Sequence, residues 1–270
     1  MPRFPSSNAF FDSFLYVERY RRVYEAGVRF YAEPVPTDAL VKFVEKYGGF
    51  LPVHGRVIEL GCGESRDAVF LASRGFNVLC VDVAELALIR GKGLVREERA
   101  ESRVDFSVMD ALHLGLRDEH FDLAVDVAFL HLIVDQDLRK RYLSEVYRIL
   151  RRGGYLFSCN LASDSPMEPE DALRSASGKT IVKRFVVKGR EVEVELPVIP
   201  AWPKTLEEYV HEIDGMGFEV IEAYKATVKP VGHACVVVAV KPQTSSHSGD
   251  RDLNRPRCFD VFLNYATWYK

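Results

Sequence analysis

Two acidic residues flank a short glycine turn early in the chain. Glu59 precedes the turn Gly61-Cys62-Gly63, and Asp82 ends the next apolar run. Glycines let a ligand approach the backbone because no side chain stands in the way. A carboxylate at the end of the second strand is placed to accept hydrogen bonds from ribose hydroxyls. These residue types predict a site for a ligand that contains a nucleoside. The alternative is a structural turn, with Asp82 as an ordinary charge at a strand end.

The residues around this turn favour the ligand site, because they predict the elements that such a site requires. Residues 57–60 form a short apolar run typical of a buried strand. A helical pattern begins at Asp67 and ends at Gly75, and residues 77–82 form a second apolar run. Strand, glycine turn, helix and strand form the first unit of a nucleotide-binding α/β domain.

Further strands are predicted at 104–108, 121–127, 155–160, 218–224 and 234–240. Helices alternate with the first five strands, which predicts a doubly wound parallel sheet. No long helix separates the last two strands, so we expect them to pair antiparallel. Two runs at 181–187 and 191–196 surround Lys188-Gly189 and predict an inserted β-hairpin. The predicted fold class is therefore α/β, with a mostly parallel seven-stranded sheet.

We expect three parts in the chain. Residues 1–36 form an N-terminal helical cap, residues 37–241 the ligand-binding domain, and residues 242–270 a linker with an aromatic tail. The hairpin insertion, about 163–203, would lie over the carboxyl edge of the sheet as a substrate lid, or else be a decorative insertion. The aromatic tail is expected to dock on this chain or on a partner, which makes a homodimer possible.

Four tyrosines gather near the N-terminus, at positions 16, 20, 24 and 31. Two interpretations are open. The first is that the tyrosines pack the predicted helix onto the core, which accounts for most of them. The second is that one or two of them line a pocket for a cation, because aromatic faces attract sulfonium or ammonium groups.

Composition limits the partners. The formal net charge is −3, so no overall positive field recruits nucleic acid or an anionic membrane. No apolar run approaches the roughly 20 residues that span a bilayer. The five cysteines are scattered and show no metal-ligand spacing, and no histidine–carboxylate spacing indicates a metal site. A reducing cytoplasm is the simplest setting.

Further polar residues follow the third and fourth strands. Met109-Asp110-Ala111 comes directly after the third strand, at the edge where ligands bind in open α/β sheets. Asp110 is placed to accept a hydrogen bond from an exocyclic amine. His131 follows the fourth strand, and its ordinary pKa would suit a general base near neutral pH. The alternative for His131 is a packing role beneath the ligand.

The order of these elements resembles the class I S-adenosylmethionine-dependent methyltransferases, from about Leu40 to Lys241. The resemblance is carried by Glu59-Leu60-Gly61-Cys62-Gly63, Val81-Asp82, Met109-Asp110, Phe121-Asp122-Leu123 and Arg152-Gly153-Gly154-Tyr155. Within the family, residues 61–67 look most like the branch with the thiopurine and tellurite methyltransferases. One departure is Glu64-Ser65, where relatives more often have a small residue and a glycine.

The resemblance implies a Rossmann-like methyltransferase fold, S-adenosylmethionine as the cofactor and a small-molecule methyl acceptor. Glu59, Gly61, Cys62 and Gly63 would surround the methionine part of the cofactor. The ribose and adenine would lie against Asp82, Val83, Met109, Asp110 and Ala111. Asp126 and Val127 would lie near the methionine amino group, and His131 would be the candidate base.

Two other functions use the same elements. An NAD(P)-dependent oxidoreductase is the first, but Arg66 stands where its Gly-x-Gly-x-x-Gly turn has the third glycine. A non-catalytic S-adenosylmethionine-binding protein is the second, and turnover of any methyl acceptor would exclude it. The Asn/Asp-Pro-Pro-Tyr motif of nucleic-acid amino methylases is absent after the fourth strand, where Asp126-Val127-Ala128-Phe129 stands.

Overall fold

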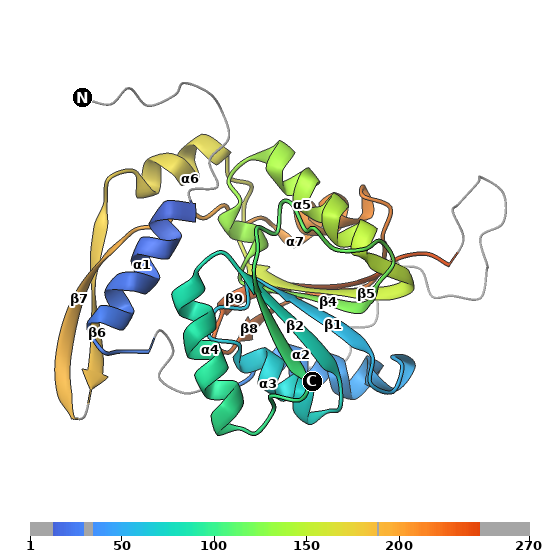
Figure 1. The fold of residues 1–270 in the computed structure, drawn as a ribbon. Coiled ribbons are helices and arrows are strands. Elements are labelled where there is room, and N and C mark those ends of the chain that lie inside the picture. The colour runs from blue at the N-terminus through green and yellow to red at the C-terminus, as the bar shows by residue number, and fades with distance from the viewer. Residues whose placement is uncertain (1–12, 30–34, 188, 244–270) are drawn as a thin grey trace, which may run out of the picture.

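The computed structural model describes residues 13–29, 35–187 and 189–243. Its centre is a seven-stranded sheet in the order β3-β2-β1-β4-β5-β9-β8 (Figure 1). The strands are β1 (Arg56–Leu60), β2 (Asn77–Asp82), β3 (Val104–Val108), β4 (Phe121–Val127), β5 (Leu150–Leu161), β8 (Glu219–Val228) and β9 (Gly232–Val240). Strands β1 to β5 pair in parallel, and β9 lies antiparallel between β5 and β8. The predicted fold class is confirmed.

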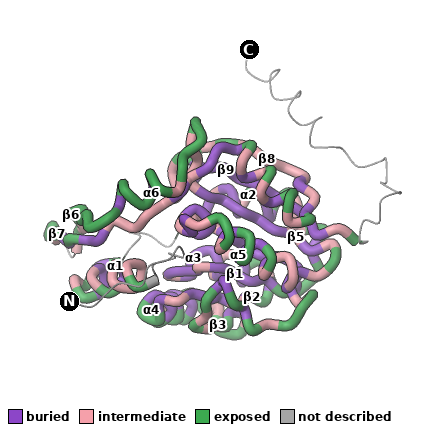
Figure 2. Tube along the Cα trace, turned by 90° about the horizontal axis from the view of Figure 1, so that it is seen from above, coloured by how far each residue is buried: buried purple, intermediate pink, exposed green. Residues whose placement is uncertain are grey.

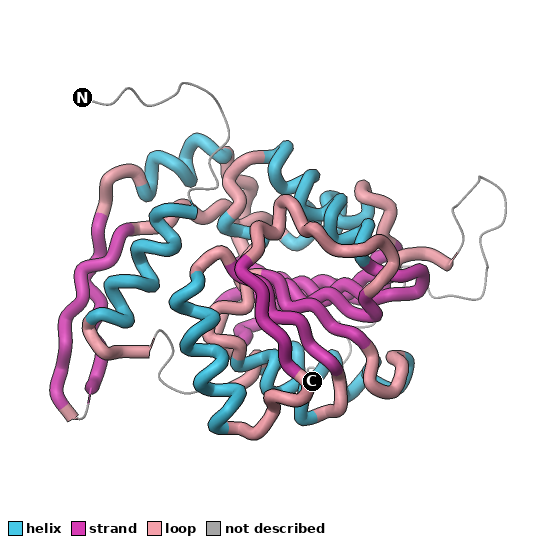
Figure 3. Tube along the Cα trace, in the orientation of Figure 1, coloured by secondary structure: helices cyan, strands magenta, loops and turns pink. Residues whose placement is uncertain are grey.

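Helices cover both faces of this sheet (Figure 3). They are α2 (Asp38–Tyr47), α3 (Arg66–Ser73), α4 (Glu85–Glu97), α5 (Gln136–Ile149) and α7 (Leu206–Asp214), with short 3-10 turns η1 (Gly48–Phe50) and η2 (Leu130–Leu132). Successive strand residues point to opposite faces. Val57 therefore joins the core beneath α2, α3 and α4, while Ile58 joins the core beneath α5 and α7. Burial on both faces explains the unbroken apolar runs in the sequence.

The fifth strand begins earlier than we predicted. Helix α5 ends at Ile149 and β5 starts at Leu150, whereas the sequence predicted a strand that begins at residue 155. The pairing of β4 with β5 shifts here, from Phe121↔Leu150 to Leu123↔Tyr155. Gly153 has a φ of +73°, so the two glycines form an irregularity within the strand instead of a helix end.

A second layer stands beside the sheet. It consists of α1 (Ser13–Glu25), α6 (Pro169–Ala176) and the hairpin β6 (Thr180–Val187) with β7 (Arg190–Pro197), as Figure 1 shows. The predicted hairpin is thus present, and it forms a sheet of its own. Its role as a lid and the division of the chain into three parts stay predictions. The linker and the aromatic tail after residue 243 lie outside the described residues.

Helix α1 and strand β7 share a small apolar core. Tyr20 and Val23 of α1 pack with Val194 and Leu196 of β7. Arg19 donates to the carbonyl oxygen of Pro197 at 2.7 Å, so the two segments are joined by polar contacts as well. In Figure 2 the central strands are buried, whereas much of the hairpin is exposed. The hairpin therefore supports α1 from the side away from the sheet.

The turn between β1 and α3 contains a strained serine. Ser65 has φ +60° and ψ +32°, in the left-handed region that glycine adopts without cost. Its side chain is buried, and its hydroxyl has no hydrogen-bond partner in the part of the chain that the structure describes. Ser65 thus has a backbone conformation that a glycine would adopt without strain.

We predict that Ser65→Gly is more stable than Ser65→Ala by about 0.5–1 kcal/mol. A left-handed backbone costs a residue with a Cβ about 1–2 kcal/mol, and the greater freedom of glycine in the unfolded chain offsets part of this. Both variants remove the hydroxyl, so their difference isolates the backbone. Urea unfolding of the two proteins measures it. If the alanine variant is the more stable one, the turn is not strained at this residue.

Candidate active site

The glycine turn lies at the carboxyl end of β1, with two aromatic rings packed against it. A Cβ on Gly61 would lie 2.6 Å from Cδ2 of Phe129, and one on Gly63 would lie 2.8 Å from the Tyr20 hydroxyl. Both glycines also have positive φ, +64° and +54°. Larger residues are therefore excluded at both positions, by backbone shape and by space.

Asp82 joins this turn to the end of β2. Its Oδ2 accepts the backbone N–H of Gly63 at 2.9 Å, and its Oδ1 accepts that of Ala84 at 2.8 Å. Burial raises the pKa of Asp82, and the backbone donors counteract this shift. A carboxylate has about four lone-pair sites, so acceptor capacity remains for the hydroxyls of a ligand.

Glu59 lines a cavity from below the turn, although its side chain is almost fully buried. It accepts a backbone hydrogen bond from Ala68, and the Cys80 thiol lies 3.9 Å from its Oε2. Burial raises the pKa of Glu59 well above its usual range. A carboxyl group in this condition is stabilised as an anion by a cation that enters the cavity, such as an ammonium group.

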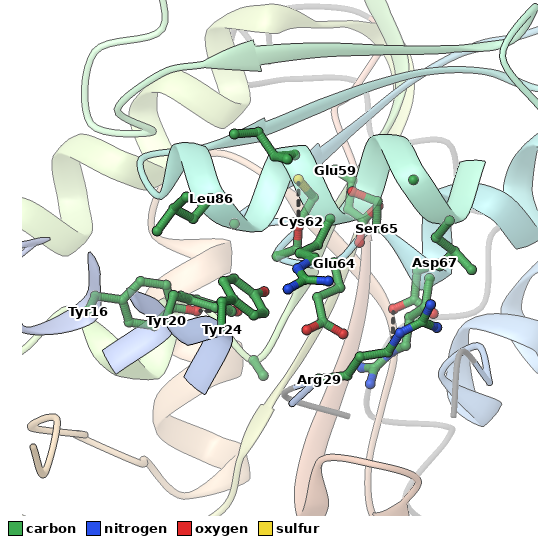
Figure 4. Close-up of a pocket in the computed structure, with 18 of the residues that line it drawn as sticks. Tyr16, Tyr20, Tyr24, Arg29, Glu59, Cys62, Glu64, Ser65, Asp67 and Leu86 are labelled. Carbon is green, nitrogen blue, oxygen red and sulfur yellow. Dashed lines mark hydrogen bonds and ion pairs between the residues drawn. The ribbon is translucent and has the colours of Figure 1, made fainter. Parts of the chain in front are cut away.

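That cavity has a volume of about 600 Å³ and lies between α1, the glycine turn and α4 (Figure 4). Tyr16, Tyr20 and Tyr24 of α1 line one side, and Glu64 extends from the turn. A second space of about 10 Å³ adjoins Asp82 and is narrowed by Tyr16 and Phe129. This smaller space holds about one water molecule, so those two rings must move before a nucleoside can enter it.

The structure distributes the predicted residues over these two spaces. The large cavity is lined by Glu59, Gly61, Cys62, Gly63 and Val127. The small space is lined by Gly61, Asp82, Val83, Met109, Asp110 and Ala111. Asp126 and His131 line neither of them. The sequence analysis missed Arg66, Arg90 and Phe129, which line the two spaces and carry no motif of their own.

Asp126 points into the protein. It accepts hydrogen bonds from the Ser158 hydroxyl at 3.0 Å, from Nδ2 of Asn160 at 2.9 Å and from the backbone N–H of Leu130 at 3.2 Å. Burial raises its pKa to about 6. Asp126 thus holds the loop after β4 in position, and the cavity is lined by Val127, the last residue of β4, and by Ala128 of that loop. That Asp126 lies near the amino group of a ligand stays a prediction.

His131 lies in the same buried network. Its Nδ1 is 2.9 Å from Oδ1 of Asn160, which can only accept, so Nδ1 carries the proton. Burial lowers the pKa of His131 to about 4. Its backbone oxygen accepts the N–H of Trp202, in the segment that leads from the hairpin to α7. These contacts favour the packing interpretation over the general base.

Known proteins share this architecture. Residues 58–158 match the sequence model of a family described as a methyltransferase domain. An uncharacterized methyltransferase of Schizosaccharomyces pombe is 32% identical over 85 residues, which are 32% of this chain and 57% of that protein. The 2-heptyl-1-hydroxyquinolin-4(1H)-one methyltransferase of Mycobacteroides abscessus is 30% identical over 118 residues, 44% of this chain and 49% of the relative. The chain thus spans about half the length of these curated relatives.

Solved structures resemble it over a longer stretch. A 1,6-didemethyltoxoflavin-N1-methyltransferase of Burkholderia thailandensis, solved with its substrate and S-adenosylhomocysteine, has a TM-score of 0.61 at 19% identity. The similarity covers 89% of this chain and 93% of that one. A methyltransferase of Methanosarcina mazei has a TM-score of 0.56 at 21% identity, over 74% of this chain and 98% of the other.

The fold is α/β, and the candidate site has a carboxylate at the end of β2. Residues 58–158 match a methyltransferase domain, and the solved structures show that the chain has the fold of S-adenosylmethionine-dependent methyltransferases. The closer likeness to the thiopurine and tellurite branch stays a prediction.

The residues present fit the cofactor of this family. Asp82 lines the small space, where it would accept hydrogen bonds from ribose hydroxyls, and Glu59 lines the large cavity, where it would pair with the methionine ammonium. Asp110 lies half-exposed at the other end of the small space, where its Oδ1 accepts the N–H of Leu112 at 2.9 Å. A second lone pair of this carboxylate stays available for adenine.

We predict that Glu59→Gln stabilises the free protein and weakens cofactor binding. Because the pKa of folded Glu59 lies above its usual 4.5, ionised Glu59 lowers the free energy of unfolding as the pH rises past 4.5. The variant should therefore be more stable than the wild type at pH 7.5, because it carries no carboxyl group whose ionisation is opposed by burial. The difference should be small at pH 4.5. Denaturant unfolding at the two pH values measures both, and equal differences would contradict the burial cost.

We predict an opposite pH dependence for His131→Gln. The pKa of His131 falls from 6.5 to about 4 on folding, so protonation favours the unfolded wild type as the pH falls from 6.5 to 4. The unfolding free energy of the variant minus that of the wild type should therefore rise by up to about 3 kcal/mol between pH 7 and pH 4. Asp126 titrates in the same range, but both proteins contain it, so its contribution to the difference in unfolding free energy cancels. A flat difference would place His131 in contact with water.

Proposed function

We propose that this protein is an S-adenosylmethionine-dependent methyltransferase that moves a methyl group to a small-molecule acceptor. The observation that carries the proposal is the pair of buried carboxylates at the glycine turn. Asp82 is held by the backbone N–H of Gly63, and Glu59 faces the cavity on the other side of the turn. One acid suits ribose hydroxyls and the other suits an ammonium group, so together they match the two ends of this cofactor.

When bound, S-adenosylmethionine supplies a methyl carbon already activated by the positive sulfur. The work of the protein is then to align donor and acceptor and to exclude water. Helix α1 and the hairpin behind it are suited to this work, because α1 forms a wall of the cavity opposite the glycine turn. A base is needed only if the acceptor keeps its proton until attack. His131 is a weak candidate for that base because it lies in the buried network with Asn160.

A small-molecule acceptor is supported by charge and by the relatives. The net charge of −3 does not favour nucleic acid. The relative from Mycobacteroides abscessus is named for a heptyl-hydroxyquinolone, and the structure from Burkholderia thailandensis is named for a didemethyltoxoflavin. Both names describe compact heterocycles, and we extend that size class to the acceptor here. No helix in the described part of the chain is long and apolar enough to cross a bilayer. The cytoplasmic setting and the homodimer stay predictions.

The oxidoreductase alternative conflicts with the start of α3. A dinucleotide pyrophosphate binds at a helix N-terminus that a glycine keeps open. Here Arg66 fills that position with a largely buried side chain, and the Asp67 carboxylate follows it. Asp67 accepts the N–H of Thr37 at 2.6 Å and its hydroxyl at 2.8 Å, so it is fixed in place. Thr37 stands at the N-cap of α2, but its hydroxyl donates to Asp67 and makes no side-chain cap. A buried acid there repels phosphate.

We predict that the purified protein binds S-adenosylhomocysteine in a calorimetric titration and binds neither NADH nor NADPH. Asp82→Asn should weaken this binding by more than about 1 kcal/mol, roughly fivefold or more, because a charge-assisted hydrogen bond to the ribose is lost. Asp122→Asn is the matched control, since Asp122 also accepts a backbone N–H, that of Arg56, at the opposite edge of the sheet. Binding of a nicotinamide cofactor alone would refute the proposed function, and unchanged binding by Asp82→Asn would refute the ribose site.

A further inference from the structure

Two of the N-terminal tyrosines, Tyr20 and Tyr24, have positions that packing explains. Tyr24 packs in the core shared by α1 and the hairpin, and the guanidinium of Arg90 lies over its ring, 5.2 Å from the centroid. Tyr20 is buried, with its hydroxyl against Gly63. The packing interpretation of the sequence therefore holds for both. Tyr31 lies outside the described residues.

Tyr16 occupies a different place. The large cavity and the small space have two lining residues in common, and these are Tyr16 and Gly61. Tyr16 belongs to α1 and Gly61 to the glycine turn, so the two come from opposite walls of the site. Tyr20 holds the ring from behind, with ring centroids 5.2 Å apart at 70° and hydroxyls 3.5 Å apart. In Figure 4 the side chains of Tyr16 and Tyr20 project from α1 toward the turn.

This inference rests on the proposed function, which determines which atom of the cofactor lies at the junction of the two spaces. With the methionine end at Glu59 and the ribose at Asp82, the atom that joins them lies between the large cavity and the small space. In S-adenosylmethionine that atom is the positively charged sulfur. Gly61 offers no side chain there. Of the two rings that narrow the small space, only Tyr16 also lines the large cavity, so Tyr16 is the aromatic side chain beside the junction once both rings have shifted to admit the nucleoside.

We propose that the ring of Tyr16 binds the sulfonium by a cation–π contact and so distinguishes the charged cofactor from its neutral product. The face of an aromatic ring attracts a cation within about 6 Å of its centroid. After methyl transfer the sulfur is a neutral thioether, and this attraction is gone. The contact thus favours exchange of S-adenosylhomocysteine for fresh S-adenosylmethionine, and Tyr16 determines cofactor specificity without taking part in the bond changes.

The test compares the affinities of three ligands for the full-length protein and its Tyr16 variants. S-adenosylmethionine and sinefungin both carry a positive charge at the junction, and S-adenosylhomocysteine carries none. Tyr16→Leu should reduce the affinity for the two charged ligands by about 3- to 30-fold and leave that for the neutral ligand nearly unchanged. Tyr16→Phe keeps the ring face and should keep the wild-type preference. Calorimetry at one pH and ionic strength gives all the values.

Fluorination provides a version of this test that keeps the size of the side chain. A trifluorinated phenylalanine at position 16 has an electron-poor ring, so its preference for charged ligands should fall below that of Tyr16→Phe. Val17→Ala is the control for α1, because Val17 packs against the hairpin core and does not line the cavity. It should leave the ratio of the charged to the neutral affinities unchanged.

The outcomes separate the two proposals. Equal losses for all three ligands in Tyr16→Leu would mean that Tyr16 only fills space. A loss in Tyr16→Phe as large as in Tyr16→Leu would assign the effect to the hydroxyl, and either result overturns the cation–π contact. Wild-type protein that binds none of the three ligands would refute the proposed function, and the sulfonium site with it.

Discussion

The site depends on one interaction, the acceptance of backbone N–H groups by the buried carboxylate of Asp82. Burying an ion is costly unless hydrogen bonds replace its water. The N–H groups of Gly63 and Ala84 do so, and in return the carboxylate fixes the glycine turn against the end of β2. The place of Glu59 relative to the small space follows, because β1 leads directly into this turn. A single polar contact thus sets the distance between the two halves of the ligand site.

Opposite the glycine turn, the wall of the cavity is supported by two segments that are far apart in the sequence. Helix α1 precedes the sheet and β7 follows its fifth strand, yet they share an apolar core and arginine contacts to main-chain oxygens. The acceptors on β7 are backbone carbonyl groups, so these arginine hydrogen bonds do not depend on which side chains β7 carries. The tyrosines of this wall that line the large cavity, Tyr16, Tyr20 and Tyr24, all come from α1.

Much of the fold could be predicted because its signals are local. Strand runs such as 57–60, the capping box from Thr205 to Glu208 and the hairpin around Gly189 depend on neighbouring residues only. The direction of a side chain beyond a strand end depends on distant partners. Asp126 turns inward because Ser158 and Asn160 of β5 offer it donors, and no pattern within β4 reveals them. Ala128, with φ +58°, then redirects the loop that carries His131.

The separation of α1 from β7 in the sequence has a consequence for co-translational folding. Arg22 donates to the main-chain oxygen of Glu195, which is 173 residues later. At 5–20 residues per second, β7 is made roughly 10 to 35 s after α1. During that time the tyrosine face of α1 has no hairpin to cover it, although the sheet is already emerging. The wall of the site can therefore assemble only after β7 has emerged, and the nascent chain carries its aromatic helix without the hairpin until then.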